Sequence, residues 1–369
     1  MEHLIPQQAF DNAHTTQFML LLIMAASVWI LIRGADLLVE GAAGIAYRFG
    51  LSKIIIGATI VSLGTTSPEA AVSVMAAWEG KSGLALGNAV GSVIADTGLI
   101  FGLGCALTVL PADAFVLNRQ GWLKIGTGFL LAAICYVLWL MHGPAAQLGR
   151  PVGILLLLLL VGYLYVSVRW SRIHPHGEPF VTAVTEDARI EDEVTTVVSD
   201  EELRRRRLPQ LLLMLIAGLV LVVFSSRFLI GSVTVLADRW GLSQIVIAAT
   251  LVALGTSLPE LVVGMTAVFK GHKELLVGNV IGADILNVLF VIGASAAATP
   301  LPLFDPTARL PHIFLVLHLP AMLIMLVLFL AYIRAANRTG SFKRWYGLPL
   351  LGLYVLYVVV LLILGGTEG

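Results

Sequence analysis

The sequence predicts an all-α integral membrane protein of about ten transmembrane helices, arranged as two inverted repeats of five helices. Three observations support this fold class. Of the 369 residues, 58% are hydrophobic and only 12% are charged. Apolar stretches long enough to cross about 30 Å of hydrocarbon recur along the whole chain. One of these regions is repeated, without a gap, in the second half.

The apolar stretches place ten membrane spans. The first sixteen residues lack the basic segment and the cleavage site of a signal peptide, so we expect the first span to be retained. Cys105 and Cys135 both fall within spans, which argues against a disulfide framework and against a cysteine metal site. The predicted spans are 17–46, 53–78, 82–110, 121–141, 151–170, 208–238, 243–269, 274–298, 311–333 and 346–365.

The basic residues predict the orientation of the chain in a cell membrane. If both termini lie outside, 17 of the 23 Lys and Arg residues fall in cytoplasmic loops, in agreement with the positive-inside rule. The opposite loops keep only Lys81, Arg150, Arg239 and Arg309. The cytoplasmic set is Arg48, Lys53, Arg119, Lys124, Arg169, Arg172, Arg189, Arg204 to Arg207, Lys270, Lys273, Arg334, Arg338, Lys343 and Arg344.

One long polar segment divides the chain into three parts. Residues 172–207 hold nine acidic residues and the run Arg204 to Arg207, without the alternating Asp/Asn and Gly pattern of a calcium-binding loop. This composition favours a flexible, cytoplasmic charged linker. We therefore expect the first inverted repeat, helices one to five, over 1–171 and the second, helices six to ten, over 208–369.

The strongest signal is the internal repeat. Leu51–Gly104 aligns with Leu242–Ser295 at a constant offset of 191 residues, and 21 of the 54 aligned pairs are identical. Apolar composition alone would give about five identities. Each copy lies in a half of five spans, and an odd number of crossings inverts the second copy in the membrane. Transporters built this way commonly bind their substrate at the repeat interface, near the bilayer midplane.

Each copy carries a single charged residue within an apolar stretch of 25 residues. Glu69 is the only charged residue in 54–78, and Glu260 is the only one in 245–269. A carboxylate near the bilayer centre costs at least ~2.5 kcal/mol, so each should face a partner, an ion or a water-filled cavity. Two carboxylates in symmetric positions suggest one shared site.

A helix-breaking signal precedes each glutamate. We expect an interruption that frees carbonyl groups near Thr65 and Thr256 and restarts a half-helix with the glutamate in its first turn. In a simpler interpretation each Glu complements a helix dipole and each Pro kinks a span, which explains either copy alone but not both together. The two signals are Gly64-Thr65-Thr66-Ser67-Pro68 and Gly255-Thr256-Ser257-Leu258-Pro259.

The next span of each copy adds polar side chains spaced four residues apart on one helix face. Oxygen ligands without Cys or His suit calcium or sodium rather than zinc or copper, and we expect these transported ions without any cofactor. The interleaved glycines, Gly87, Gly91, Gly278 and Gly282, indicate close helix packing. The polar residues are Asn88, Ser92 and Asp96, with Asn279, Ala283 and Asn287 as counterparts.

These motifs resemble the paired alpha-repeats of the cation/calcium exchanger superfamily, specifically its prokaryotic sodium/calcium exchangers, which centre on G-T-S-x-P-E and G-N-x-x-G-S. The resemblance implies a ten-helix fold in which the first and sixth helices slide to switch access. It implies that Glu69 and Glu260 bind calcium or sodium. Further oxygens would come from Thr65, Thr66, Ser92, Asp96, Thr256, Ser257 and Asn287.

Several positions depart from the commoner family pattern. Ala283 replaces a Ser, and Asp96 and Asn287 look exchanged between the repeats. Asp284 and Val93 stand where Asn is usual. Because Asp284 lies about 60° around the helix from Asn287, it either joins the site or lines its entrance.

We predict a secondary antiporter, not an enzyme, in which calcium and sodium compete for the same carboxylates under alternating access. An alternative keeps the fold and couples calcium transport to protons or potassium. A remote alternative is an intramembrane aspartyl protease using Asp96 and Asp284, which would leave both glutamates unexplained. The chain lacks an ATP-binding G-x-x-x-x-G-K-[ST] loop, its apolar composition points to the lipid bilayer as its surroundings, and we expect no nucleic-acid partner. The oligomeric state and the direction of transport stay open.

Overall fold

The computed structural model describes residues 17–49, 51–173, 206–239, 257–304 and 312–365. Within these ranges, nine helices are long and apolar enough to cross a membrane. The shorter apolar helix α14 (Leu258–Phe269) ends the seventh predicted span, whose beginning lies outside the described residues. The prediction of an all-α membrane protein is confirmed.

The first half of the chain builds five spans. Helix α2 (Gln17–Phe49) forms the first and α9 (Arg150–Ile173) the fifth. The second, third and fourth spans each contain a π-helical stretch, with hydrogen bonds from residue i to i+5. These spans consist of α3 (Lys53–Ile56), η1 (Gly57–Val61) and α4 (Ser62–Trp78), of α5 (Ser82–Ala95), η2 (Asp96–Phe101) and α6 (Gly102–Leu107), and of α7 (Ala114–Val116), η3 (Leu117–Gly121), α8 (Trp122–His142) and the 3-10 turn η4 (Gly143–Ala145).

The second half follows the same plan. Its first helix is α11 (Leu208–Arg239), and α14 belongs to the next span. The remaining spans are α15 (Lys273–Leu286), η7 (Asn287–Ile292) and α16 (Gly293–Ala298), then η8 (Phe314–His318) and α17 (Leu319–Thr339), and finally the 3-10 turn η9 (Arg344–Tyr346) and α18 (Gly347–Gly365).

The two halves repeat each other element by element. The bounds of α15, η7 and α16 are those of α5, η2 and α6 shifted by 191 residues, the offset of the aligned sequences. Helices α4 and α14 end at corresponding residues, and Gly80 and Gly271 follow them, both with φ of +75°. This left-handed conformation favours glycine, which explains why both copies keep it.

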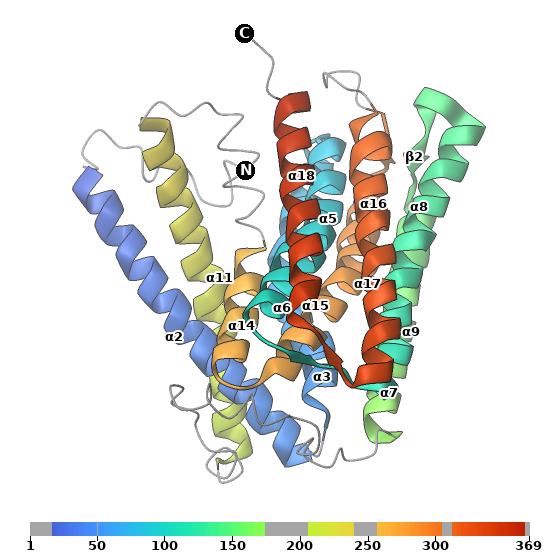
Figure 1. Ribbon diagram of the computed structural model, residues 1–369. Coiled ribbons are helices and arrows are strands. Elements are labelled where there is room, and N and C mark those ends of the chain that lie inside the picture. Colours follow the sequence, from blue (N-terminus) through green and yellow to red (C-terminus); the bar gives the residue numbers. More distant parts are fainter. Residues whose placement is uncertain (1–16, 50, 174–205, 240–256, 305–311, 366–369) are drawn as a thin grey trace.

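The second half is inverted relative to the first. In Figure 1, α2 runs from the upper to the lower end of the molecule, whereas α11 runs from the lower to the upper end. The beginning of α2 and the end of α18 lie at the same, upper end. Short antiparallel strands join one half to the other: β1 (Leu110–Pro111) pairs with β4 (Ser341–Phe342), and β2 (Gln147–Leu148) pairs with β3 (Leu301–Pro302).

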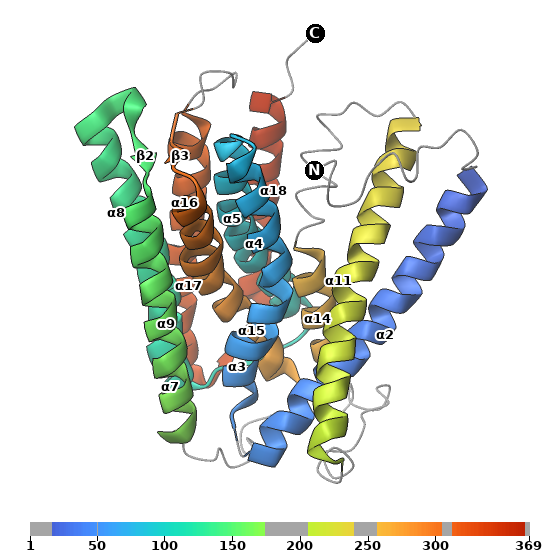
Figure 2. The ribbon, with the colours of Figure 1, turned by 180° about the vertical axis from the view of Figure 1, so that it is seen from behind.

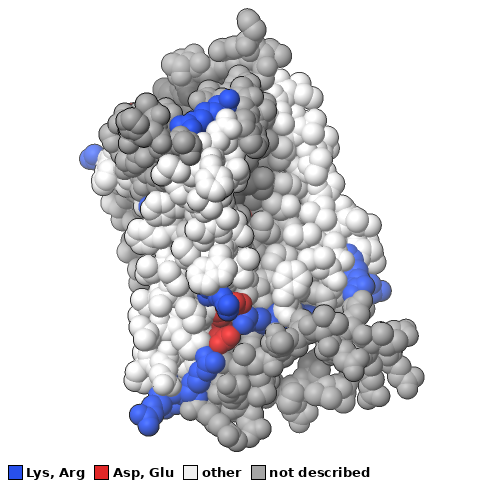
Figure 3. Space-filling view, turned by 90° about the vertical axis from the view of Figure 1, so that its left-hand side faces the viewer, with Lys and Arg blue, Asp and Glu red and all other residues white. Residues whose placement is uncertain are grey.

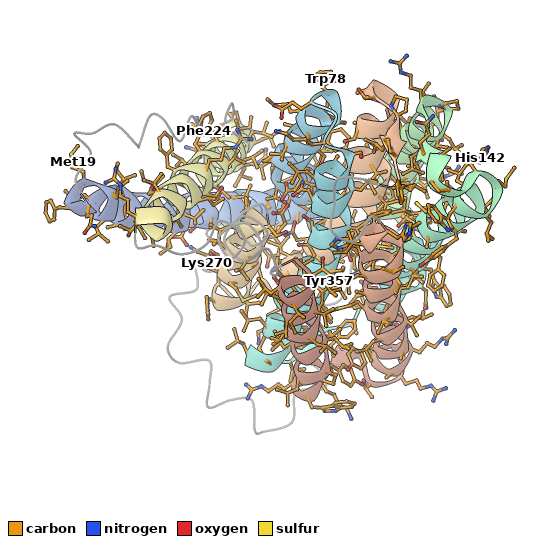
Figure 4. All side chains as sticks on the ribbon, turned by 90° about the horizontal axis from the view of Figure 1, so that it is seen from above. Met19, Trp78, His142, Phe224, Lys270 and Tyr357 are labelled. Carbon is orange, nitrogen blue, oxygen red and sulfur yellow. The ribbon has the colours of Figure 1, made fainter. Side chains whose placement is uncertain are left out.

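Helices α2 and α11 stand apart from the main bundle. Figure 2 shows them crossing on one side, and Figure 4 shows them projecting from the bundle when seen from above. They pack tightly on each other, because a Cβ atom at Gly41 would lie 2.7 Å from the backbone nitrogen of Leu215. A Cβ atom at Gly218 would similarly lie 2.7 Å from the carbonyl oxygen of Gly34. Small residues of this kind let two membrane helices approach closely.

The outer surface suits a lipid environment. Large apolar side chains such as Phe18, Trp29, Leu213 and Phe224 are exposed. Figure 3 shows a broad uncharged surface on the side of α2 and α11, with charged side chains toward its ends. Because water would not favour so much exposed apolar surface, the chain is a multi-pass membrane protein.

The predicted interruption at Gly64–Pro68 is wrong for the first copy. Helix α4 continues through Pro68, and the irregular stretch is the π-helical η1 that precedes it. Hydroxyl groups bond to nearby helix carbonyls: Ser67 donates to the carbonyl of Leu63 and Thr65 to that of Val61. Pro68 therefore lies within a continuous helix, which membrane helices tolerate. In the second copy, Gly255 and Thr256 lie outside the described residues.

Candidate ion-binding site

Four carboxylate side chains lie buried where the two repeats meet. Glu69 is on α4, Asp96 begins η2, Glu260 is in the first turn of α14 and Asp284 is on α15. Each is at most 2% exposed. The charges of Glu69 and Glu260 interact, and Glu69 also interacts with Asp96. Carboxylates buried this deeply require an opposite charge or hydrogen bonds.

Hydrogen bonds connect these groups across the repeat boundary. Thr66 donates from Oγ1 to Oε1 of Glu260 over 3.4 Å. Asn287 donates from Nδ2 to Oδ2 of Asp96 over 3.4 Å. Thr65 also lies within reach of the Glu260 carboxylate. The structure therefore brings together polar groups from α4, η2, α14 and η7, as the symmetric positions of the two glutamates predict.

Many oxygen atoms at this place have no hydrogen-bond partner among the described residues. Four of them come from the first repeat and three from the second, and only the hydroxyl oxygens carry a proton to donate. Such an array is a set of hard oxygen ligands suited to sodium or calcium. The atoms are both Oε atoms of Glu69, Oε2 of Glu260, Oδ1 of Asp96, Oδ1 of Asn287, Oγ of Ser92 and Oγ of Ser257.

The local helix geometry presents these atoms in the same way in both repeats. Asp96 and Asn287 are each the first residue of a six-residue π-helical stretch. A π-helical stretch changes the register of the side chains that follow it, and such stretches frequently occur at functional sites. In η1, the carbonyl of Ala58 accepts a hydrogen bond of 2.7 Å from the hydroxyl of Tyr163. The repeat thus specifies the backbone as well as the side chains.

Close backbone packing leaves no room for larger side chains beside the site. A Cβ atom at Gly278 would lie 2.1 Å from the carbonyl oxygen of Ile54, and one at Gly282 would lie 2.4 Å from that of Ala58. The predicted packing role is confirmed for these two glycines and is wrong for Gly87 and Gly91, where an added Cβ atom would meet nothing within 4 Å. Helix α15 therefore lies directly against α3 and η1 and brings Asp284 toward the repeat interface.

Carboxylates alone do not form a metal cluster here. Across the described part of the chain, no group of three or more His, Cys, Asp and Glu side chains is arranged to hold one metal ion. A bound cation would therefore need hydroxyl, amide or carbonyl oxygens besides the carboxylates. Thr65 and Ser257 are buried at the site and suit this role, whereas Thr256 lies outside the described residues.

Asp284 has a partner that the sequence analysis missed. Lys124 Nζ lies 2.8 Å from Oδ2 of Asp284, and both side chains are buried. Thr97 donates from Oγ1 to the same oxygen over 2.7 Å. The assignment of Lys124 to a cytoplasmic loop is wrong, because the span begins at α7, capped by Asp113, and includes Lys124 in α8. The signal was present, since Lys124 is the only charged residue in 121–141.

Comparison with known proteins shows the family of the chain. A family model described as sodium/calcium exchanger protein matches residues 19–169 and 210–363, most of both halves. The chain belongs to this sodium/calcium exchanger family. The resemblance of its motifs to the prokaryotic sodium/calcium exchangers is confirmed.

Two relatives and one solved structure show how far the likeness extends. The inner membrane protein YrbG of Escherichia coli is 31% identical over 278 residues, 75% of this chain and 79% of YrbG. The sodium/calcium exchanger MaX1 of Methanosarcina acetivorans is 29% identical over 364 residues, 94% of this chain and 99% of MaX1. The structure of the sodium/calcium exchanger of Methanococcus jannaschii matches with a TM-score of 0.72 and 24% identity, covering 93% of this chain and 99% of that chain. This last likeness supports the fold.

Proposed function

We propose that this protein is a secondary antiporter that exchanges calcium for sodium across the cell membrane by alternating access. The observation that carries the proposal is the array of buried oxygens from both repeats around Glu69 and Glu260 that have no hydrogen-bond partner within the described part of the chain. The relative MaX1, similar over nearly its whole length, is named a sodium/calcium exchanger. Family membership supports cation/calcium antiport, and the oxygen array supports sodium and calcium as the two competing ions.

Exchange follows from competition for the same few oxygens. Calcium binding requires the carboxylates of Glu69 and Glu260 together, and sodium ions bind the same groups in separate positions. Asp96, Asn287, Ser92 and the hydroxyls beside each glutamate complete the coordination. Because loading one ion type excludes the other, each must leave before its rival enters, which couples the two gradients.

Access to the site alternates when α2 and α11 move as a pair. Leu38 and Leu215 of this pair belong to an apolar cluster that also includes Leu275 of α15 and that is distinct from the large core of the main bundle. Gly64 of α4 faces Leu219 of α11, where a Cβ atom would lie 2.8 Å from Leu219 Cδ1. Because Gly64 presents no side chain to α11, the pair can slide past the helix that carries Glu69.

The charge of the site predicts electrogenic exchange. Because Lys124 neutralises Asp284, the site keeps the charges of Glu69, Glu260 and Asp96. Three sodium ions would neutralise these charges, whereas one calcium ion would leave a net charge of −1. Calcium flux that does not respond to a membrane voltage, set with potassium and valinomycin, would contradict this charge count.

Calcium-45 uptake into proteoliposomes preloaded with sodium tests the proposal. We expect uptake by the wild-type protein and its loss in both Glu69→Gln and Glu260→Gln. Glu79→Gln, at the exposed end of the helix that carries Glu69, is the matched control and should transport normally. Sodium-independent uptake, or uptake that survives both substitutions at the buried glutamates, would reject the proposal.

The same assay distinguishes the alternatives. Uptake driven only by a proton or a potassium gradient would show that protons or potassium, rather than sodium, are the coupling ion at the same site. The structure does bring Asp96 and Asp284, the candidate protease pair, close enough to interact. However, the ammonium of Lys124 holds Asp284, and the family consists of exchangers, so transport accounts for both aspartates without proteolysis.

Orientation and domain organisation remain part of the proposal. We infer that both termini face outward and that 172–207 is a cytoplasmic linker between repeats 1–171 and 208–369. Residues 174–205 of this linker lie outside the described residues. Cysteine labelling from either side of intact cells, at a position introduced beside Arg189, would test the orientation, since labelling from outside would contradict it.

A further inference from the structure

A lysine lies buried beside the proposed ion site. The side chain of Lys124 has no exposure, and its Nζ lies 2.8 Å from Oδ2 of Asp284. The ammonium also lies 3.8 Å from the ring centre of Phe329, whose face attracts a cation. The positive charge is therefore held between a carboxylate and an aromatic ring, away from water.

The group around Lys124 breaks the symmetry of the repeats. The Lys124–Asp284 pair and Thr97, which bonds to Asp284, are all polar, yet the equivalent positions of the opposite repeat are all apolar. Because an unpaired buried aspartate is costly, the lysine and the aspartate form a unit. The counterparts are Val93 for Asp284 and Val288 for Thr97 at the offset of 191, and Ala321 for Lys124 when η3 and η8 are aligned at their first residues.

This unit touches the site through Asp96. The carboxylate of Asp96 interacts electrostatically with both Asp284 and Lys124. Its Oδ2 accepts the hydrogen bond from Asn287, and its Oδ1 has no partner among the described residues. The charge of Lys124 therefore acts on a carboxylate that the proposed mechanism uses to hold an ion.

We propose that Lys124 is a built-in cation of the transport site: its ammonium takes the place of a monovalent ion at Asp284. Glu69, Glu260 and Asp96 are then the charges that transported ions neutralise. This inference rests on the proposed exchange and specifies which charges set its coupling ratio. With Lys124 the four carboxylates carry a net charge of −3, and without it they carry −4.

Counting bound ions tests this assignment without requiring transport. Purified variants in detergent are dialysed to equilibrium against sodium-22, and the sodium ions bound per protein are counted. We expect Lys124→Met to bind one more sodium ion than the wild type, because Asp284 becomes available. Adding Asp284→Asn to Lys124→Met should remove that extra ion. Lys343→Met, an exposed lysine outside the site, is the matched control for the lost charge.

Two results would overturn the assignment. One is a folded Lys124→Met variant that binds no additional sodium. The other is a double variant that binds one sodium ion fewer than the wild type, which would make Asp284 a ligand of a transported ion. If Lys124→Met does not fold, as judged by size-exclusion chromatography, the double variant still decides, because it removes both buried charges together. Failure of calcium uptake in proteoliposomes would reject the exchange function. The number of sodium ions bound per protein in detergent could still be measured and would still test the role of Lys124.

Discussion

Asn287 donates a hydrogen bond from Nδ2 to Oδ2 of Asp96 over 3.4 Å, and the two residues occupy the same position of opposite repeats. Each begins a π-helical stretch of the same length. Two equivalent residues can meet only where the repeats meet, so this contact marks the repeat interface. Glu69 and Glu260, which are also equivalent, interact across the same interface.

This contact predicts that the charge at the interface can be exchanged between the repeats. Asp96→Asn should weaken calcium binding by about tenfold, because about 1.4 kcal/mol of charge interaction is lost. The double variant Asp96→Asn/Asn287→Asp, which restores the charge on the opposite helix, should bind calcium within about threefold of the wild type. Calcium-45 equilibrium binding measures both values. A double variant as weak as the single one would show that the two positions are not interchangeable.

The hydroxyl of Thr66 should contribute to ion affinity through Glu260. Thr66→Val removes a hydrogen bond to Oε1 of Glu260, and a loss of about 1 kcal/mol corresponds to about fivefold weaker calcium binding. Thr66→Ser keeps the hydroxyl and serves as the control. The half-saturating calcium concentration for uptake is the measurement. Equal values for the valine and serine variants would mean that the hydroxyl does not matter.

The contact between α2 and α11 should tolerate no added side chain. In Gly218→Ala, the new methyl group would lie 2.7 Å from the carbonyl oxygen of Gly34 and even closer to the backbone nitrogen of Leu38. Overpacking of this kind costs about 1–3 kcal/mol, so thermal unfolding in detergent should occur at a lower temperature. Gly162→Ala on α9 meets no atom within 4 Å and is the control. Equal unfolding temperatures would contradict the close packing.

An ion-pair group should hold α2 against the turn between α14 and α15. Lys270 Nζ lies 2.8 Å from Glu40 and 3.3 Å from Asp36, and Glu40 also pairs with Arg206 at 2.9 Å. Acidic and basic side chains meet on the lower part of the face in Figure 3. Because these pairs are partly exposed, Lys270→Met should change the calcium uptake rate by only about two- to fivefold. Lys343→Met is the control, and an identical effect of both variants would exclude a specific role.

The pH dependence of this group follows from the pKa of Lys270. Burial alone lowers that pKa, but the hydrogen bond to Glu40 and the charges of Glu40 and Asp36 outweigh burial and raise it. A raised pKa means that the stabilisation is complete below the ordinary lysine pKa and is lost as the pH rises through the higher, folded value. The stability of the wild type should therefore differ from that of Lys270→Met at neutral pH, and the two stabilities should converge only in strongly alkaline buffer. A difference that disappears near neutral pH would contradict this assignment.

Local sequence rules predicted most of the site but overstated one feature. Glu69 and Glu260 were predictable because a charged side chain within an apolar span is costly unless it faces a partner, an ion or water. The duplicated sequence places one such side chain in each repeat. The expected interruption before Glu69 is absent, since α4 continues through Pro68 and the irregular stretch is the preceding π-helical η1. A rule about one proline considers only the local backbone, whereas a transmembrane helix packed among its neighbours tolerates a proline.

The sequence by itself determined the membrane location, the duplication with its inversion and the two symmetric glutamates, because hydrophobic length and identity at a constant offset are properties of the chain. Only the tertiary structure decided what each charge faces. Lys124 and Asp284 lie on helices α8 and α15 of different repeats, and Lys270 reaches Glu40 on α2 from a turn far along the chain. Electrostatic partners depend on distance in space, and helices that are remote in sequence become neighbours only when the two repeats pack together.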